Sequence, residues 1–432
     1  MSIYVESLND LQEYQSTITH GTCFFHFIYN EKIHPSKTSP IVLFVHHFDT
    51  HETYVFSFSH PDIICINPDI LQIVLNVPCK KLIFDKKNAR HFANLDTFID
   101  IKFDNYAKTL NELYVKLPNV TDIRSCPIMI IKKSFNDTLE LLKNKIEDVD
   151  IEQCEFEDDF SKQLSMIESS GIHVDRSTFN LADHVVIDEH DCVHSQYNML
   201  TPTYRPSNRF AKINFAALNK KKNERDCICS RHDEGAIVMI DYESYHLRLF
   251  GTHVGFDLPK TSLHEYLGCL YHDKDTLTEE EYELSKKITF NIMYGGVSDD
   301  IKENIPFMNQ IALYVEKLWR EYNSIGYVKT WFYKKKLRKS TYGELNPYKL
   351  FNYVLQNAET ERNCLMMKKI NEEIKSTDIK FILYHYDAFI FDMKFSDFHY
   401  VENIKNSLID DGMYPVKIYA GGNYGDLKLI NV

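Results

Sequence analysis

The amino-acid sequence predicts an α/β region that is followed by a larger α+β region. To about residue 145, short apolar strands alternate with short helices, which is an α/β pattern. Beyond Thr201, an apolar strand precedes a largely helical stretch, and a β-hairpin lies near the end of the chain. The acidic stretch 147–159 has few apolar residues and is the best candidate for a linker.

The elements of the first region follow from its apolar runs and the turn residues between them. Residues 23–29 are almost entirely apolar and indicate a strand. Two further strands within 40–58 are expected to form a hairpin that turns at 49–52. A helix near 70–75 and a strand at 81–84 continue the alternation on which the α/β prediction depends.

The second region opens with a predicted helix. Residues 160–167 are amphipathic and are followed by Gly171, a residue type that commonly ends helices. An apolar strand is expected at 236–240, and a hairpin at 381–393. The stretch between them is mostly of helical character, so the region is predicted to be α+β.

The composition indicates a folded globular protein with room for two or three domains. The chain has 432 residues, of which 44% are hydrophobic and 13% aromatic. Its net charge of -13 argues mildly against nucleic-acid binding, which depends on Lys and Arg. Basic runs at 220–222 and 334–336 nevertheless concentrate positive charge locally, although either run could equally be a solvated surface.

The cysteine pattern favours a reducing compartment. The chain has ten cysteines but no CxxC pair, which argues against a zinc ribbon and against a secreted disulfide framework. The stretch 190–194 reads His-Asp-Cys-Val-His, but no second cluster at ligand spacing accompanies it. The N-terminus lacks signal features, and no apolar run is long enough to cross a bilayer. We expect a cytoplasmic protein without a membrane partner.

Two aspartates stand at the ends of apolar strands. Asp241 directly follows the run 237–240, and Asp387 lies at the tip of the predicted hairpin. Taken singly, the first is better explained as a helix N-cap and the second as an ordinary turn residue. Two aspartates on adjacent strands of one sheet can, however, hold two cations about 3.5–4 Å apart, as two-metal phosphoryl transfer requires.

A cation and two aromatic residues recur at a spacing of four. Lys286, Phe290 and Tyr294 share one face of a predicted helix. An ordinary amphipathic helix with a snorkelling lysine would show the same pattern. The same face would also offer a cation for a triphosphate and aromatic surfaces on which a nucleobase stacks.

In their order, these segments resemble the motifs of family A DNA polymerases. Residues 241–248 are similar to the first palm motif of that family, residues 286–295 to its fingers helix, and Tyr386-Asp387 to its second palm motif. Four weaker similarities fall in the right order, at 203–207 with Asn214, at 262–264, at 326–331 and at 352–359. The seven segments together are far more specific than any one of them.

The resemblance implies template-directed DNA synthesis, in which deoxynucleotides are added to a primer 3′ end at two Mg²⁺ ions, with Mn²⁺ as a substitute. The implied partners are primer–template DNA and dNTPs. The residues are listed by implied role: Asp241, Asp387 and the Tyr242 carbonyl for the metals; His246, His264, Lys286, Phe290 and Tyr294 for the nucleotide; Arg205, Asn214, Asn352, Gln356 and Tyr386 for DNA.

The resemblance also implies an α/β exonuclease-like domain followed by an α+β right-hand polymerase module with palm, fingers and a much reduced thumb. The expected ranges are 1–145 for the exonuclease-like domain, 146–202 for the linker and vestigial thumb, 203–254 and 346–432 for the palm, and 255–345 for the fingers. So short a thumb would grip a duplex poorly, and we expect a processivity or replisome protein as a partner. The compact design is similar to that of phage-encoded members, and viral genome replication is the expected role.

Several positions depart from the family pattern. His246 stands where the family has a glutamate that helps to exclude ribonucleotides, Tyr282 replaces an arginine, and Ala388 replaces a third carboxylate. The first strand of the N-terminal region lacks the DxE pair that proofreading needs on one strand face. We expect no proofreading activity.

Two alternatives stay open on this evidence. A single-subunit RNA or primer polymerase shares the palm and fingers plan, and Tyr294 fits either class. A non-catalytic subunit could keep the polymerase fold as a scaffold. The scaffold is disfavoured because both palm aspartates are present beside Lys286 and Phe290.

Overall fold

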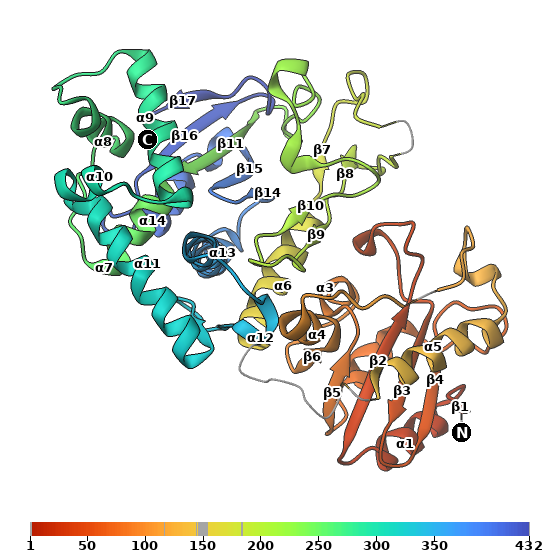
Figure 1. Cartoon of the computed structure of the whole chain (residues 1–432). Helices are drawn as coiled ribbons and strands as arrows, with labels where there is room; N and C mark the ends of the chain where they lie inside the picture. Colours follow the sequence, from red (N-terminus) through yellow and green to blue (C-terminus); the bar gives the residue numbers. More distant parts are fainter. Residues whose placement is uncertain (1, 116, 144, 146–153, 183–184, 432) are drawn as a thin grey trace. The chain divides into compact units, whose positions relative to one another are not determined.

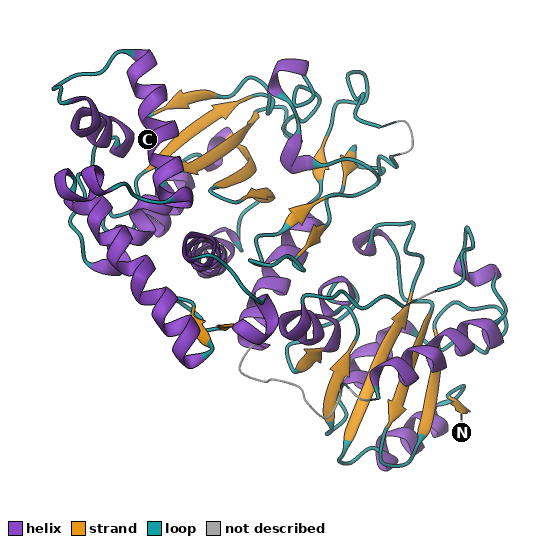
Figure 2. Cartoon of the chain, in the orientation of Figure 1, coloured by secondary structure: helices purple, strands orange, loops and turns teal. Residues whose placement is uncertain are grey.

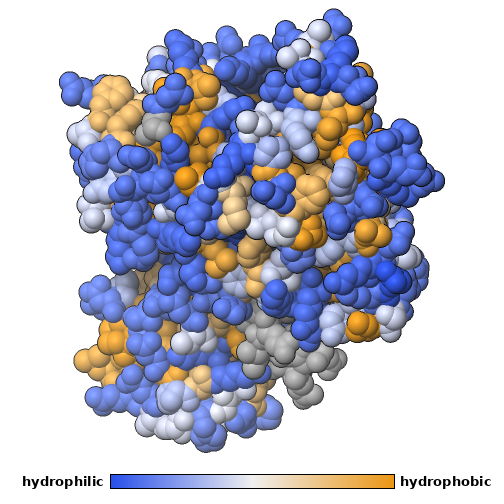
Figure 3. Space-filling model, turned by 90° about the vertical axis from the view of Figure 1, so that its left-hand side faces the viewer, coloured by the Kyte–Doolittle hydropathy of each residue, from blue (hydrophilic) through white to orange (hydrophobic). Residues whose placement is uncertain are grey.

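The computed structural model describes residues 2–115, 117–143, 145, 154–182 and 185–431. Within it the chain forms two compact units, Met1–Ser169 and Ser170–Val432 (Figure 1). No helix among the described residues combines the length and the apolar character needed to cross a membrane. On the face drawn in Figure 3, polar residues predominate and apolar residues form small separate groups.

The first unit contains a six-stranded mixed sheet in the order β1-β4-β3-β2-β5-β6. The three central neighbours β4, β3 and β2 are antiparallel, whereas β5 and β6 continue the sheet in parallel to β2. The strands are β1 Ser2–Tyr4, β2 Thr22–Ile28, β3 Val42–His47, β4 Glu52–Ser57, β5 Lys80–Ile83 and β6 Phe98–Asp100.

Both faces of this sheet are buried, because successive side chains of β2 point to opposite faces. Phe25 and Phe27 belong to one apolar cluster, and Phe24 belongs to the other, where it stacks with Phe135 of α5. The helices of the unit are α1 Leu8–Thr17, α2 Leu71–Leu75, α3 Lys86–Ala89, α4 Ile101–Thr109, α5 Ile128–Leu142 and α6 Cys154–Ser170.

The predicted strands of this region are confirmed, but part of the predicted linker is wrong. Of the stretch 147–159, residues 147–153 lie outside the described residues, and 154–159 form the first turns of α6. Phe156 and Phe160, four residues apart, are buried and stack on each other, with ring centroids 5.2 Å apart. Their burial explains why an acidic segment is helical. The helix predicted at 160–167 is confirmed, and Gly171 after it has a left-handed φ of 65°.

The second unit is built on a five-stranded antiparallel sheet in the order β14-β15-β11-β16-β17. Its strands are β11 Gly235–Tyr242, β14 Lys380–His385, β15 Ala388–Lys394, β16 Val416–Gly421 and β17 Lys428–Ile430. The strand predicted at 236–240 and the hairpin predicted at 381–393 are both confirmed. Only two residues, Tyr386 and Asp387, connect β14 to β15.

Three small strand pairs accompany the sheet: β7 Ile172–His173 with β8 Cys192–Val193, β9 Tyr197–Asn198 with β10 Ser207–Asn208, and β12 Tyr327–Lys329 with β13 Lys336–Arg338. Between residues 176 and 202, no described residue belongs to a helix.

The helices of the second unit gather beside the sheet (Figure 2). They are α7 Tyr245–Val254, α8 Leu263–His272, α9 Glu279–Gly295, α10 Asp299–Asn304, α11 Pro306–Ile325, α12 Lys339–Tyr342, α13 Pro347–Ile374 and α14 His399–Ile409. The seven residues 357–363 of α13, two full helical turns, are all buried. Helix α13, seen end-on in Figure 1, is therefore a central helix surrounded by protein on every side at that level.

Candidate active site

Asp241 and Asp387 lie on neighbouring strands of the second unit's sheet. Asp241 is the penultimate residue of β11 and pairs with Ala388 of β15. Asp387 immediately precedes Ala388, and the N–H of Tyr242 donates a hydrogen bond of 3.0 Å to the Asp387 carbonyl. The antiparallel register thus brings together two carboxylates that are separated by almost 150 positions in the sequence.

The electrostatics of this pair favour a bound cation. Burial, with Asp387 as the next cause, raises the pKa of Asp241 to about 7. The Asp387 side chain is exposed, yet the surrounding protein partly desolvates its carboxyl group. This desolvation, followed by the negative charge of Glu359, raises the pKa of Asp387. Neither carboxylate accepts a hydrogen bond from another residue within the described part of the chain. A divalent cation would relieve both the repulsion and the missing contacts.

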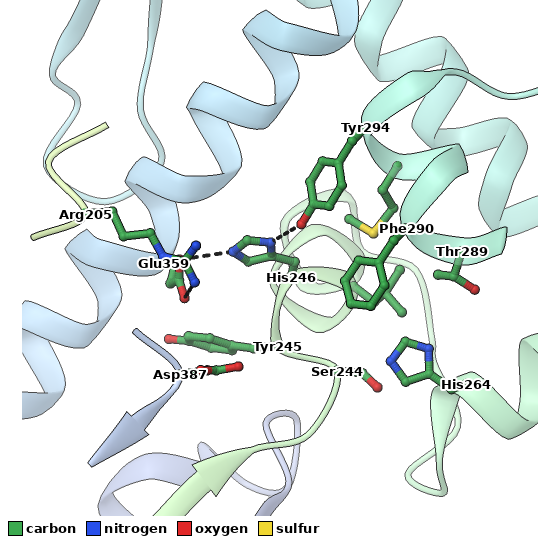
Figure 4. A pocket seen from close by; sticks show the side chains of 12 residues that line it. Arg205, Ser244, Tyr245, His246, His264, Thr289, Phe290, Tyr294, Glu359 and Asp387 are labelled. Atoms are coloured by element: carbon green, nitrogen blue, oxygen red, sulfur yellow. Dashed lines mark hydrogen bonds and ion pairs between the residues drawn. The ribbon is translucent and has the colours of Figure 1, made fainter. Parts of the chain in front are cut away.

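A cavity of about 330 Å³ opens beside Asp387 (Figure 4). Its walls come from the segment after β11, from α8, from α9 and from α13. The lining residues are Arg205, Ser244, Tyr245, His246, Leu247, His264, Thr289, Phe290, Met293, Tyr294, Glu359 and Asp387.

One wall of the cavity is aromatic. Phe290 and Tyr294, one turn apart on α9, have nearly parallel rings with centroids 6.1 Å apart. Phe290 is 47% exposed, and the His264 ring lies 5.8 Å from it. An exposed phenylalanine over a cavity provides the flat apolar surface on which a base can stack.

A cation lies one turn before Phe290. Lys286 does not line the cavity but is close enough to His264 that, after burial, its charge is the next cause of the lowered pKa of that imidazole. Lys286 itself forms an ion pair of 3.0 Å with Glu283 and lies 4.6 Å from the centre of the Tyr282 ring. His264 is consequently held neutral near pH 7 while Lys286 carries the positive charge.

A chain of polar contacts crosses the cavity from Arg205 to Tyr294 (Figure 4). Arg205 Nη2 donates to Glu359 Oε1 over 3.3 Å, and Glu359 Oε2 lies 3.1 Å from His246 Nε2. On its other side, His246 Nδ1 is 2.7 Å from the Tyr294 hydroxyl. The position that departs from the family pattern, His246, is therefore held by hydrogen bonds on both sides.

Known proteins resemble this chain in structure but not detectably in sequence. No family model matches the chain, and no curated protein matches its sequence. In structure, the chain is similar to the POL domain of Pol1 from M. smegmatis, which was solved in complex with DNA primer-template and dNTP. The TM-score is 0.71 at 12% sequence identity, over 98% of this chain and 100% of that one. The chain has the fold of a family A-like polymerase.

The predicted resemblance is thus confirmed for the fold, and the expected mixture of helices and sheets with it. On this polymerase fold, the cavity brings together six of the predicted site residues: Arg205, His246, His264, Phe290, Tyr294 and Asp387. Asp241 joins them through its coupling to Asp387.

The remaining predicted residues lie outside the cavity lining. Gln356 accepts a hydrogen bond of 2.9 Å from the Thr203 hydroxyl and donates one of 3.0 Å to Asn352. Tyr386, in a left-handed conformation at the hairpin tip, carries the Arg205 guanidinium 3.7 Å above its ring. Asn214 precedes a short 3₁₀ helix, Phe215–Ala217, and does not line the cavity.

Sequence reasoning missed the buried polar residues of α13. Arg362 donates to the Tyr242 hydroxyl over 2.6 Å and stacks on Tyr414, and the Asn363 amide donates to the Tyr386 carbonyl. These contacts connect α13 to the ends of the strands that carry both aspartates. The sequence did contain a signal for them. Residues 357–363 place ionic and amide side chains on every face of one helix, whereas a surface helix needs polar side chains only on its exposed face.

One other cluster of metal-ligating side chains was found among the described residues. His34, His91 and Glu168 in the first unit have ligand atoms within 4.8 Å of one another. Glu168 already pairs with His91 at 2.9 Å and with the buried Lys87 at 2.5 Å. Since Lys87 neutralises this carboxylate, we interpret the cluster as a buried ion-pair network. The stretch 190–194 forms no such cluster in the described structure; His194 instead pairs with Asp188 at 3.2 Å.

Proposed function

We propose that the chain is a DNA-directed DNA polymerase that adds deoxynucleotides to a primer 3′ end. The observation that carries this proposal is the meeting of Asp241 and Asp387 beside a cavity whose far wall holds the stacked Phe290 and Tyr294. The similarity to a POL domain solved with primer-template and dNTP supports it.

Asp241 and Asp387, with the Tyr242 carbonyl, would hold two Mg²⁺ ions, for which Mn²⁺ could substitute. Their donor atoms are all oxygens, the ligands that these hard cations prefer, and the two carboxylates lack hydrogen bonds from other described residues. Ions held by these residues would supply charge stabilisation at the attacking and leaving oxygens of phosphoryl transfer. In this proposal the two aspartates would hold both ions without the third carboxylate that Ala388 replaces.

The aromatic wall and its neighbours would bind the incoming nucleotide. Phe290 would pack on the base and sugar, and Tyr294 would lie near the templating base. Lys286 would provide the charge for the triphosphate, while the neutral His264 would donate a hydrogen bond to it. His246 would border the sugar.

The primer–template would lie along the side formed by Arg205, Tyr386 and the start of the buried part of α13. Arg205, Asn214, Asn352, Gln356 and Tyr386 are the proposed contacts. Amide and guanidinium groups of this kind can follow the backbone and groove of a duplex without reading its sequence.

For the domains, we propose a palm at 203–254 and 346–432, fingers at 255–345 and a thumb reduced to part of 146–202. The lack of helix among the described residues of 176–202 supports the reduced thumb. We therefore also propose a processivity or replisome protein as a partner, and viral genome replication as the role. Product lengths measured with a DNA trap test the partner, since long products from the chain alone would contradict it.

For the first unit, we propose an exonuclease-like domain without proofreading activity. Its mixed sheet supports the layout, and β2 carries no carboxylate. Asp49 lies in the β3–β4 turn, and Glu52 begins β4, so these two acids do not form a pair along one strand face.

Primer extension tests the proposed function. A labelled primer on a DNA template is incubated with Mg²⁺ and dNTPs, using the wild type, Asp387→Ala and the control Asp378→Asn. Asp378 is an exposed acid that precedes the same hairpin and pairs with Lys394. Extension that persists in the control and disappears in Asp387→Ala is the expected result. Extension by Asp387→Ala at the wild-type rate would contradict the proposal.

The same assay separates the two alternatives. Preferential use of ribonucleotides would indicate a single-subunit RNA or primer polymerase, an outcome that His246 keeps open. An absence of extension by the wild type, with or without candidate partners, would indicate a catalytically silent scaffold.

A further inference from the structure

Glu359 is a buried carboxylate at the centre of the polar chain that crosses the cavity. It lies within α13 and is 1% exposed. Its Oε1 accepts a hydrogen bond from Arg205, whereas its Oε2 lies 3.1 Å from both Arg205 Nε and His246 Nε2. A buried carboxylate is costly unless it is paired, so both contacts are structural requirements of this position.

The contact with Arg205 fixes the orientation of the carboxylate. Arg205 Nη2 donates to Oε1 over 3.3 Å, and its Nε lies 3.1 Å from Oε2. The opposite face of the same guanidinium rests on the Tyr386 ring, 3.7 Å away. Arginine has only donors, so whatever atom replaces Oε1 must be an acceptor.

The contact with His246 fixes a tautomer. A carboxylate can only accept, so His246 Nε2, 3.1 Å from Oε2, must carry a hydrogen. In the neutral imidazole, Nδ1 is then an acceptor, and its partner at 2.7 Å, the Tyr294 hydroxyl, must be the donor. The hydrogen of Tyr294 is thereby used, and its oxygen presents lone pairs to the cavity.

We propose that Glu359 is a positioning residue of the nucleotide pocket, which sets the tautomer of His246 and through it makes the Tyr294 hydroxyl oxygen a hydrogen-bond acceptor towards the substrate. The proposal rests on the proposed function only for its kinetic consequence. Its structural part concerns three side chains that are hydrogen-bonded to one another in the protein itself.

Replacement of Glu359 by glutamine reverses the pattern without a change of shape. Arg205 Nη2 donates to Oε1, whereas Arg205 Nε, 3.1 Å from Oε2, makes no hydrogen bond to it. The amide oxygen therefore faces Arg205 Nη2, and the amide NH₂ faces His246 Nε2. The imidazole must then accept at Nε2 and carry its hydrogen on Nδ1. Nδ1 donates to Tyr294, whose own hydrogen becomes available to the cavity. Glu359→Asp retains an acceptor and should retain the original tautomer.

The first experiment reads the tautomer directly, by ¹⁵N–¹H correlation of the imidazole nitrogens in the full chain labelled at histidine. The signals of His246 are identified by their loss in His246→Gln. We expect a hydrogen on Nε2 in the wild type and in Glu359→Asp, and on Nδ1 in Glu359→Gln. The control Glu361→Gln removes another buried glutamate of α13, one that binds the backbone N–H groups of Phe332 and Tyr333, and should leave His246 unchanged.

A wild-type His246 with a hydrogen on Nδ1, whether alone or together with one on Nε2, would overturn the proposal, as would an unchanged tautomer in Glu359→Gln. This readout needs no catalysis, so it remains decisive if the chain proves not to be a polymerase. Circular dichroism of each variant confirms that it is folded. If Glu359→Gln does not fold, the wild-type assignment can still refute the proposal, and Glu359→Asp should show the same tautomer as the wild type.

The second experiment is kinetic. Reversal of one hydrogen bond at the pocket should raise the KM for dNTP about tenfold in Glu359→Gln, with a smaller change in kcat. In a Tyr294→Phe background, which keeps the ring but lacks the hydroxyl, Glu359→Gln should have no further effect on KM. Additive effects of the two substitutions would show that Glu359 does not act through Tyr294.

Discussion

The two units each contain an aspartate whose pKa is raised to about 7, and the two residues serve different purposes. Asp100 in the first unit is buried and caps α4, where it accepts hydrogen bonds from the backbone N–H groups of Lys86, Lys102 and Phe103. Asp241 in the second unit accepts none from another described residue and lies beside Asp387, which lines a cavity. A raised pKa alone therefore does not identify a site; unused acceptor atoms beside accessible space do.

Buried ion pairs of the first unit show how most interior charges of this protein are compensated. In the first unit, charged side chains neutralise one another in the interior, as Lys86 does with Glu157 and Lys87 with Glu168. In the second unit, the two carboxylates at the sheet end repel each other. The second unit also has buried ion pairs, such as Lys335 with Glu361, so the difference lies in these two carboxylates, whose charge stays available to a ligand.

Substitution of Asp241 and, separately, of Asp100 should test this difference between the two units most clearly. Asp241→Asn is expected to lower the rate of primer extension by at least about 10³-fold, because it removes a metal ligand. Asp100→Asn, which also removes an acid with a raised pKa, should leave extension within a few-fold of wild type at a temperature where it is folded. Rapid-quench primer extension measures both, and equal losses in the two variants would contradict the distinction.

A companion assay tests the first unit for exonuclease activity within the full chain. The purified wild type should not shorten a mismatched primer in the presence of Mg²⁺ without dNTPs, since β2 has no carboxylate. Magnesium-dependent removal of the mismatched end that survives Asp241→Asn would assign an exonuclease site to the first unit.

Disruption of the buried ion pair between Lys87 and Glu168 should produce the next largest effect, a loss of stability. Glu168→Gln leaves Lys87 charged and buried, and should lower the free energy of unfolding by about 3–5 kcal/mol. The pKa of Glu168 is lowered to about 2, so its contribution is fully present above the ordinary value near 4.5 and disappears as the pH falls towards 2. Urea unfolding at pH 7 measures the loss. The exposed pair Lys143–Glu140 is the control, and Glu140→Gln should cost less than about 1 kcal/mol.

The sequence allowed the prediction of the elements that carry the aspartates, but not of the helix that supports them. Asp241 and Asp387 follow apolar strands, and strand patterns are local features of the sequence. Glu359 lies in a segment that was recognised, yet its role depends on Arg205, 154 positions away, and on His246, 113 positions away. Such partners become apparent only when the tertiary structure brings three elements together.

The linker shows the opposite kind of failure. The acidic stretch 147–159 indicated an exposed connection, but within it Phe156 and Glu157 are buried, the latter against Lys86. Charge density is a guide to exposure only when the charges are not paired internally. A lysine 71 positions earlier that neutralises the glutamate could not be identified from the segment itself.

Mg²⁺ should stabilise the second unit in a pH-dependent manner. Asp241 has a raised pKa, so its protonated form stabilises the fold below the ordinary value near 4, and this contribution is lost as the pH rises through about 7. Mg²⁺ competes with that proton. At a concentration of about 100 Kd it should stabilise the protein by about 2.7 kcal/mol at pH 8 and by much less at pH 5. Differential scanning fluorimetry with and without Mg²⁺ measures the difference, which Asp241→Asn should abolish.

The smallest expected effect concerns His26, at the middle of β2. Both ring nitrogens lack a hydrogen-bond partner among the described residues, and the ring stacks against Phe24 and Phe135. Burial lowers its pKa to about 4, so this imidazole stays neutral in the folded protein while it is protonated in the unfolded chain below about pH 6.5. Its cost to stability is therefore absent at neutral pH and grows as the pH falls to about 4.

His26→Phe should remove this dependence, because phenylalanine fits the same aromatic stack without a charge to desolvate. At pH 5 the variant should be more stable than wild type by about 2 kcal/mol beyond any difference measured at pH 8. Urea unfolding at the two pH values gives the number. Equal destabilisation of His26→Phe at both pH values would contradict the prediction, because it would mean that protonation of His26 does not affect the stability of the wild type.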